Sequence, residues 1–245
     1  TPLPTHTPTA TLTSTPTPLP THTPVPVETA TPTEVYEPVV PTLGQELWRF
    51  KTGDWVHSSP AISSGVVYVG SDDGYLYALD GGTGQEIWKF RAGIRLRRVR
   101  SRPAISGGVV YFGSDDRHLY ALDGVTGQEI WKFPTGDQIS TSPAISSGVV
   151  YFDSQDDYLY ALDAGTGQEN WKFPTGNFGR IDSSPAISGG VVYFGSYDGH
   201  LYALDAVTGQ EIWKFPTGDR VHSSPVILGG VVYFGSRDNY LYALK

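Results

Sequence analysis

The chain has 245 residues, a net charge of −8 at neutral pH and no cysteine. The acidic balance disfavours nucleic acids and anionic membranes as partners, and without cysteine the chain has neither disulfides nor thiolate metal sites. It contains no run of about 18 apolar residues that would span a membrane. Because it carries neither an initiator methionine nor a signal peptide, we expect a mature or trimmed chain.

The first 43 residues are dominated by threonine and proline. Proline removes backbone donors and fixes φ near the polyproline II value, so residues 1–43 are predicted to form an extended stalk or arm. A disordered linker is the alternative. Threonine beside proline is also the composition of O-glycosylated stalks, which indicates a secreted or cell-surface glycoprotein. The candidate glycosylation sites are Thr5, Thr7, Thr9, Thr13, Thr15, Thr17, Thr23 and Thr31.

The remaining residues, 44–245, consist of five copies of one sequence unit. The period is about 40 residues, and several strand-like runs per period are typical of a radial or solenoid β architecture. A tryptophan marks the same position in every copy. The copies begin at Gly44, Gly84, Gly127, Gly167 and Gly209, and their tryptophans are Trp48, Trp88, Trp131, Trp171 and Trp213.

Each complete unit contains four short runs that predict β-strands, separated by glycine-containing turns. Residues 109–112 are apolar on both faces, as expected of a strand between neighbouring sheets. Residues 86–90 alternate instead, as expected of an outer strand with one exposed flank. Four antiparallel strands per unit, repeated at a near-constant step, predict an all-β fold with the blades of a β-propeller.

One motif carries a family resemblance. The pattern Ala-Leu-Asp-x-x-Thr-Gly-Gln-Glu-x-Trp occurs at residues 78–88, 121–131, 161–171 and 203–213. It resembles the tryptophan-docking motif of PQQ-like β-propeller repeats, which are named for quinoprotein alcohol dehydrogenases that use pyrroloquinoline quinone. The resemblance covers residues 44–245 and implies that each tryptophan packs on the motif glycine of an adjacent blade. Thr/Pro tracts precede similar propellers in bacterial surface proteins, so the resemblance also favours that location.

The ends of the repeat region predict how the ring closes. The first unit opens with an outer strand alone, at residues 44–50, and the last unit ends after its third strand, at residues 240–245. Residues 45–50 are therefore expected to pair with the last sheet as its missing fourth strand. This pairing would give a complete five-bladed propeller that is closed by its N-terminal strand.

The longest connection between blades is rich in arginine. It contains Arg91, Arg95, Arg97, Arg98, Arg100 and Arg102. Guanidinium groups bind carboxylates, sulfates and phosphates in bidentate geometry, which favours a docking patch for an acidic partner or an anionic glycan. The alternative is a solvated loop that balances nearby aspartates.

Metal sites and catalysis find weaker support in the sequence. Hairpin pairs such as Asp72-Asp73 are ordinary turn chemistry, whereas calcium needs about six to eight oxygen ligands. His57 and His222 are equivalent residues that would chelate a metal if ring closure brought their blades together, although repetition alone explains them. Asp153, which replaces a repeated glycine, is interpreted as tolerated drift. The resemblance implies that a quinoprotein site would need a calcium-binding carboxylate set and, in many members, a vicinal disulfide, and the sequence has no cysteine. A serine precedes the proline in most repeats, which indicates a structural role for this serine rather than a catalytic one.

We therefore expect a protein without cofactor or metal that is not an enzyme. The leading hypothesis is an extracellular structural or interaction module, such as the repeating subunit of a glycosylated surface filament. Self-association through the N-terminal arm is predicted, and residues 35–40 of that arm could add a strand to a blade. The alternatives are an adhesion module that binds a glycan or an anion, and a degenerate quinoprotein-like enzyme domain.

Overall fold

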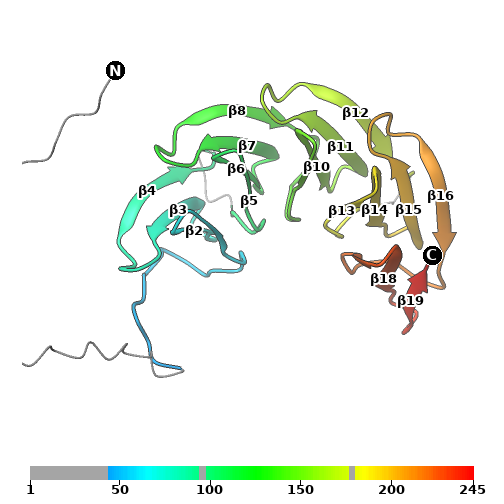
Figure 1. The fold of residues 1–245 in the computed structure, drawn as a ribbon, viewed down its shortest axis with the longest axis horizontal. Helices are drawn as coiled ribbons and strands as arrows, with labels where there is room; N and C mark the ends of the chain where they lie inside the picture. The colour runs from blue at the N-terminus through cyan, green and yellow to red at the C-terminus, as the bar shows by residue number, and fades with distance from the viewer. Residues whose placement is uncertain (1–43, 94–97, 177–179) are drawn as a thin grey trace, which may run out of the picture. The chain divides into compact units, whose positions relative to one another are not determined.

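The computed structural model describes residues 44–93, 98–176 and 180–245 (Figure 1). The chain divides into two units, Thr1–Gln45 and Glu46–Lys245, and the repeats lie in the second. The predicted Thr/Pro arm, with its candidate glycosylation sites, lies outside the described residues, as do Arg95 and Arg97. Within the described ranges we find no helix with the length and hydropathy of a membrane span.

Nineteen strands form five antiparallel sheets within these ranges, and each sheet is one blade. The first blade contains β1 (Ala61–Ser63), β2 (Val66–Gly70), β3 (Tyr75–Asp80) and β4 (Glu86–Arg91). The second contains β5 (Ala104–Ser106), β6 (Val109–Gly113), β7 (His118–Asp123) and β8 (Glu129–Pro134). The third and fourth contain β9 (Ala144–Ser146), β10 (Val149–Ser154), β11 (Tyr158–Asp163), β12 (Glu169–Pro174), β13 (Ala186–Ser188), β14 (Val191–Gly195), β15 (His200–Asp205) and β16 (Glu211–Pro216). The fifth contains β17 (Val226–Leu228), β18 (Val231–Gly235) and β19 (Leu241–Leu244).

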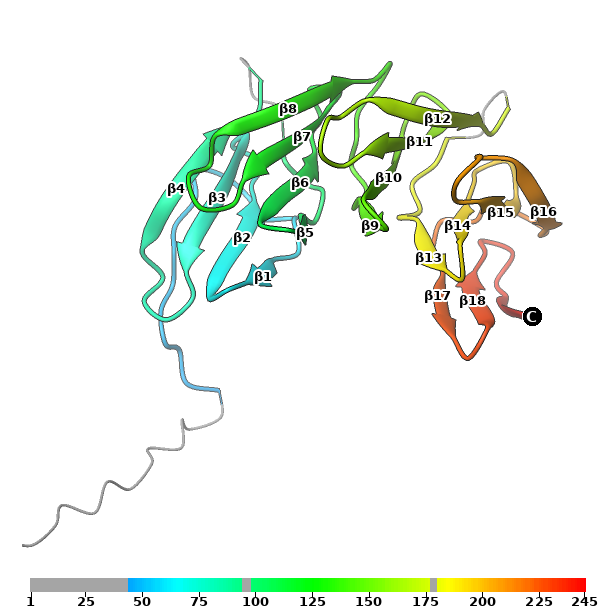
Figure 2. The same ribbon diagram turned by 45° about the horizontal axis from the view of Figure 1, so that its top comes forward.

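The all-β prediction with four antiparallel strands per blade is confirmed for the first four sheets. Successive blades touch through their first strands, since β5 contacts β1 and β9, and β13 contacts β9 and β17 (Figure 2). The four short runs of each sequence unit become the four strands in order, because residues with positive φ make the tight turns between them. Most of these residues are glycines, but Arg117, Asp157 and Asn239 take this conformation in the hairpins between the second and third strands of their blades. Each sequence repeat therefore supplies the strands of the blades in a fixed order.

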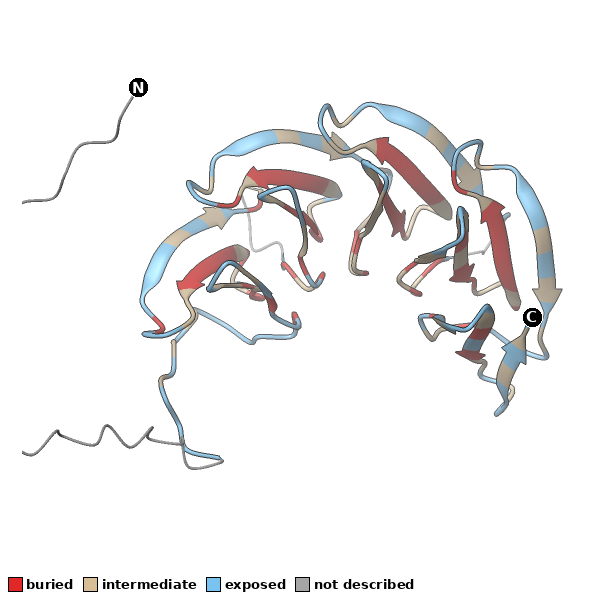
Figure 3. Cartoon of the chain, in the orientation of Figure 1, coloured by how far each residue is buried: buried red, intermediate tan, exposed pale blue. Residues whose placement is uncertain are grey.

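The core lies between the second and third strands of neighbouring blades (Figure 3). In β7, Leu119 and Leu122 are fully buried, because both faces of this strand are covered by neighbouring sheets. The outer strand β8 alternates between exposed and half-buried residues, as predicted for a strand with one solvated flank. Phe112 of β6 stacks on Tyr120 of β7 with ring centroids 5.2 Å apart.

Four of the five repeat tryptophans lie against the motif glycine of the next blade, and Trp213 has no such glycine partner within the described residues. The indole N–H of Trp88 donates to the carbonyl oxygen of Gly124 at 3.0 Å, and the hydroxyl of Tyr68 donates to the same oxygen at 3.2 Å. A Cβ on Gly127, which has a φ of 71°, would lie 2.6 Å from Cδ2 of Trp88. Glycine is therefore required there both by backbone conformation and by the close approach of the ring. The same geometry joins Trp48 to Gly84, Trp131 to Gly167 and Trp171 to Gly209.

The fifth blade differs from the others. It has three strands, and residues 46–50 belong to no strand although Trp48 lies against Gly84 of the first blade. Leu241 of β19 is 78% exposed, whereas its equivalent Leu119 in β7 is fully buried. Within the described residues β1 and β17 are not in contact. The pairing of residues 45–50 with the last sheet stays a prediction.

Candidate functional site

Side chains that vary from blade to blade gather at one end of the sheets. Each connection into a new blade carries an alternating triplet, such as Arg98-Val99-Arg100. The middle residue is fully buried in the second to fifth blades, whereas Val56 of the first blade is 52% exposed, and the two neighbours of each buried middle residue are less buried. The residue that opens the hairpin between the second and third strands also varies, and its backbone N–H donates to the first residue of a triplet, as from Asp115 to Arg98 at 3.0 Å. A repeated backbone frame thus presents three variable side chains per blade.

We call these side chains the variable positions. They are Trp55, His57 and Asp72 in the first blade, Arg98, Arg100 and Asp115 in the second, Gln138, Ser140 and Gln155 in the third, Arg180, Asp182 and Tyr197 in the fourth, and Arg220, His222 and Arg237 in the fifth. Eight of the twelve variable positions in the second to fifth blades line a pocket of about 400 Å³, and the fifth blade contributes only His222. Its lining is rich in hydroxyl, amide and charged groups, which suits a hydrogen-bonding ligand or partner.

Three variable positions of the first two blades, His57, Arg98 and Arg100, form ion pairs with a fourth, Asp72. Asp72 is almost fully buried and accepts two hydrogen bonds from Arg100, at 3.1 Å from Nε and 3.0 Å from Nη2. Arg98 and His57 also lie within ion-pair distance of this carboxylate, at 3.6 and 3.1 Å. Burial raises the pKa of Asp72, but the hydrogen bonds and charge of Arg100, with the charges of His57 and Arg98, lower the pKa below its usual value.

The arginine-rich loop is therefore partly neutralised by its own protein. Arg98 and Arg100 are held by Asp72, as in the alternative interpretation of a loop that balances nearby aspartates. The guanidinium of Arg91 lies over the ring of Tyr75, at 5.8 Å from its centroid. Arg102 is exposed, and its backbone N–H donates to Ser142. An anion-docking role for this loop stays a prediction.

The third blade carries a buried carboxyl group at Asp153, the residue that the sequence analysis interpreted as tolerated drift. Asp153 is 1% exposed and accepts a hydrogen bond of 2.6 Å from the Thr141 hydroxyl. Burial raises the pKa of Asp153 well above its usual value, and the nearby charges of Asp182 and Asp156 add to this effect, against the hydrogen bond from Thr141. The sequence contains a signal for this hydrogen-bonded pair, because Thr141 replaces a repeated serine and Asp153 replaces a repeated glycine in the same unit.

The hairpin aspartates have a structural role in every blade. Asp116 accepts the His118 N–H at 3.1 Å through Oδ1 and the Tyr120 hydroxyl through Oδ2. Equivalent hydroxyl bonds join Asp73 to Tyr77, Asp156 to Tyr160, Asp198 to Tyr202 and Asp238 to Tyr242. These carboxylates fix the turn and the third strand, because each bridges residues two and four positions onward.

The two equivalent histidines make separate contacts. His57 pairs with Asp72, while Nε2 of His222 contacts the hydroxyl of Tyr197. The described residues contain no group of three or more histidine, aspartate or glutamate side chains arranged to hold a metal ion. Asp182, which lines the pocket, is also engaged, since it binds Arg180 and Tyr197. This donor set does not fit a calcium-bound quinone, which needs several free oxygen ligands.

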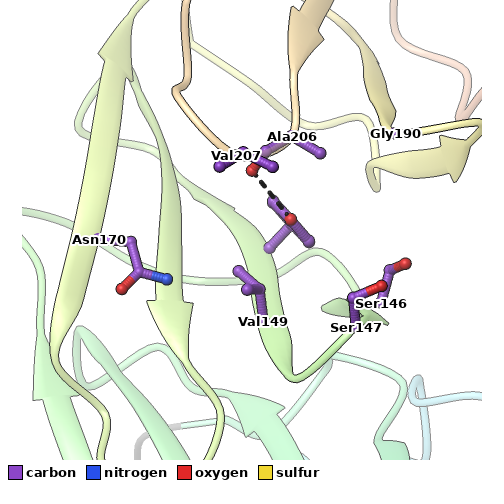
Figure 4. Close-up of a pocket in the computed structure, with 8 residues that line it drawn as sticks. Ser146, Ser147, Val149, Asn170, Gly190, Ala206 and Val207 are labelled. Carbon is purple, nitrogen blue, oxygen red and sulfur yellow. Dashed lines mark hydrogen bonds between the residues drawn. The ribbon is translucent and has the colours of Figure 1, made fainter.

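A second pocket, of about 460 Å³, lies between the third and fourth blades (Figure 4). Its polar lining comes from Ser146, Ser147 and Asn170, and Val207 on its rim is 82% exposed. The Tyr151 hydroxyl, which also lines it, donates to the Ala206 carbonyl at 3.0 Å and so belongs to the contact between blades. Asn170 replaces a repeated isoleucine and makes this groove more polar than its equivalents.

Comparison with known proteins identifies the family. A family model described as outer membrane protein assembly factor BamB, a family of PQQ-like repeats, matches residues 39–102, 83–177 and 156–245. The chain belongs to this family. The resemblance to PQQ-like propeller repeats is thereby confirmed, and no curated protein matches the chain.

Solved structures agree on the fold. BamB from Moraxella catarrhalis is 24% identical, with a TM-score of 0.70, and the match covers 80% of this chain and 60% of BamB. Quinohemoprotein alcohol dehydrogenase ADHIIG from Pseudomonas putida HK5 is 21% identical, with a TM-score of 0.67, over 80% of this chain and 41% of the enzyme. A computationally designed protein, Ika8, is 22% identical with a TM-score of 0.65, over 75% of this chain and 56% of the design. The chain thus spans 60% or less of these proteins, and at these identities the likeness shows the β-propeller fold alone.

Proposed function

We propose that this protein is a non-catalytic interaction module that assembles head to tail, with residues 45–50 of one copy completing the last blade of the next. The observation that carries the proposal is the exposed third strand β19. The sequence Leu-Tyr-Ala-Leu is buried in β3, β7, β11 and β15, yet in β19 it alternates between exposed and half-buried residues. An exposed strand edge with an apolar face favours pairing with a further strand.

The segment that fits this edge is present in the chain itself. Residues 45–50 read Gln-Glu-Leu-Trp-Arg-Phe and match the outer strand β4, whose residues pair with β3 as Ala78 with Trp88 and Tyr75 with Arg91. Transferred to the last blade, this register places Trp48 beside Ala243 and Lys51 beside Tyr240. The hydroxyl of Tyr233, which is 38% exposed, would then reach the Gly81 carbonyl that already accepts the indole N–H of Trp48.

Pairing between copies is favoured over pairing within one chain because β1 and β17 are not in contact in the described structure. One copy then offers the strand and the next offers the edge. This contact is heterologous, and it builds a filament if it does not close into a ring. The Thr/Pro arm precedes residues 45–50 directly, so an assembled surface filament would carry one arm, with its proposed O-linked sugars, at each junction.

Disulfide trapping tests the pairing. The chain has no cysteine, so Lys51→Cys with Tyr240→Cys supplies one thiol pair. Directly opposed residues of antiparallel strands have Cα atoms about 4.5–5.5 Å apart, within disulfide range. Oxidation should give disulfide-linked dimers and longer ladders on non-reducing gels.

A monomer with an internal disulfide would instead show the closed five-bladed ring and overturn head-to-tail assembly. No disulfide at all would overturn the predicted register. The matched control pairs Lys51→Cys with Leu228→Cys, because Leu228 is 73% exposed but lies on β17, two strands away from the free edge. This control pair should not crosslink above the level of either single variant.

A degenerate quinoprotein domain is the alternative from a different class of function. It is tested by incubating the protein with calcium and pyrroloquinoline quinone and measuring quinone absorbance after gel filtration. We expect no retained quinone, because Asp182 beside the pocket is bound to arginine and tyrosine and the described residues hold no cluster of carboxylates that would bind calcium. Retention at one equivalent would contradict the non-catalytic proposal.

A further inference from the structure

Three arginines surround one aromatic ring where the fourth blade meets the fifth. The guanidinium carbons of Arg180, Arg220 and Arg237 lie 5.8, 4.9 and 5.9 Å from the ring centroid of Tyr197. These four residues occupy variable positions, and in the first two blades the residue equivalent to Tyr197 is an aspartate. Like charges repel, so their gathering on one ring in an acidic protein requires an explanation.

The backbone holds this cluster in place. The Tyr197 N–H donates to the Arg180 carbonyl at 3.0 Å, and the Arg237 N–H donates to the Arg220 carbonyl at 2.9 Å. The phenol is fixed as well, because its hydroxyl donates to Asp182 at 2.7 Å and contacts His222. The ring is therefore a rigid platform, over which guanidinium groups stack favourably.

The charges of the three arginines are not equally compensated. Arg180 pairs with Asp182 at 3.1 Å. Arg220 and Arg237 have no carboxylate oxygen within ion-pair distance in the described part of the chain. The nearest acid in sequence, Asp219, accepts the backbone N–H of Arg220 at 2.7 Å, and Asp238 accepts the Gly218 N–H and the Tyr242 hydroxyl. In the first two blades, by contrast, Arg98 and Arg100 share the carboxylate of Asp72.

We propose that Arg220 and Arg237, oriented by the Tyr197 ring, bind an oxyanion group of a ligand. Each guanidinium has a planar set of N–H donors that matches a sulfate, phosphate or carboxylate. A bound anion would also offset the uncompensated positive charge of these arginines. The site is distinct from the β19 edge and does not depend on strand pairing between copies.

The ligand chemistry is tested with three simple probes: sodium sulfate, inorganic phosphate and acetate. Titration of the arginine Nε–Hε resonances by NMR at low ionic strength should show saturable shifts confined to Arg220 and Arg237. The probe with the lowest Kd identifies the oxyanion class, since a tetrahedral dianion and a carboxylate differ in charge and shape. A larger ligand that carries that group can then be sought among acidic sugars or phosphate esters.

Substitution decides whether these two residues form the site. Arg220→Gln with Arg237→Gln should raise the Kd at least tenfold while far-UV circular dichroism and Tm stay unchanged, because both side chains are exposed. Tyr197→Ala should also weaken binding, since it removes the platform but keeps both charges. Arg117→Gln is the matched control, an exposed arginine on a hairpin of the second blade, and should change the Kd less than twofold.

Equal affinity in the double variant and the unmodified protein would overturn the proposal. So would shifts of all exposed arginines that rise linearly with salt, which is the pattern of a weak counterion atmosphere. Binding of a glutamate-rich peptide without binding of any of the three small anions would likewise overturn it, in favour of an acidic protein surface.

Discussion

Strands β7 and β19 have nearly the same sequence and different surroundings. Leu119 of β7 is fully buried, because β6 and β8 pair with this strand and neighbouring blades cover both its faces. Leu241 of β19 is 78% exposed, because only β18 pairs with its strand and no further blade packs on it within the described residues. The comparison teaches that burial in this protein is set by the neighbouring strand and blade rather than by the residue itself.

The strongest test of this comparison is a matched pair of leucine truncations. Leu119→Ala should destabilise the protein by about 3–4 kcal/mol, since it removes buried apolar surface and leaves a cavity. Leu241→Ala should cost less than about 0.5 kcal/mol in a strand that stays exposed. Urea unfolding of both variants, under conditions in which the protein is monomeric, measures the difference.

The same pair also reports on strand pairing. If residues 45–50 cover β19, Leu241 becomes buried beside Phe50 and its truncation approaches the cost of Leu119→Ala. A concentration-dependent effect of Leu241→Ala would therefore support pairing between copies, and a large effect at every concentration would support closure within one chain.

A second pair of variants sharpens the comparison at glycines with positive φ. Gly127→Ala should cost about 3 kcal/mol, because alanine is strained at φ 71° and its Cβ would collide with the Trp88 ring. Gly230→Ala in the last blade has a similar φ of 78° but meets nothing within 4 Å, so its cost should be about 1 kcal/mol. Thermal unfolding separates the two, and equal costs would contradict a locking role for the tryptophan contact.

Asp153 provides a third test of how the blades differ, since it is a buried carboxyl group at a position where the last blade has Gly235. Its pKa is raised in the folded state, so folding favours the protonated form. The contribution of Asp153 to stability is complete below its unfolded-state pKa and is lost as pH rises toward its folded-state pKa. Asp153→Asn should therefore increase stability at pH 7 by about 2 kcal/mol and show no gain near pH 4.

Urea unfolding at pH 4, 5.5 and 7 measures this dependence. Asparagine keeps an oxygen that accepts the Thr141 hydroxyl, so the hydrogen bond is retained in the variant. A gain that is independent of pH would show that packing, rather than ionisation of Asp153, separates the two proteins.

The smallest expected effect concerns the hydroxyls at the contacts between blades. Tyr151→Phe removes the hydrogen bond to the Ala206 carbonyl and should cost about 1 kcal/mol. Tyr193 occupies the equivalent position in the fourth blade and, within the described residues, has no such carbonyl partner, so Tyr193→Phe should be neutral. If Tyr193→Phe is equally costly in the assembled protein, an incoming segment supplies the missing acceptor.

The sequence was sufficient for the fold because the repeat makes each local signal redundant. The glycine turns and the four strand-like runs recur in every unit, so the strand order and the antiparallel pairing follow from turn chemistry and from alternation alone. The tryptophan and glycine of the motif also lie in contact between adjacent blades, as the resemblance implied. Loop side chains carry no comparable period, and the arginine-rich loop was therefore ambiguous.

The sequence by itself determined the repeating unit, which is an all-β blade with its turns and its period. These features depend on contacts between residues that are close in the sequence. Tertiary structure alone decided which charges meet. It joined Arg100 to Asp72 and gathered Arg220 and Arg237 on Tyr197, residues that are 17 to 40 positions apart in the sequence. The energy of an ion pair depends on distance and burial, which only the packed blades define.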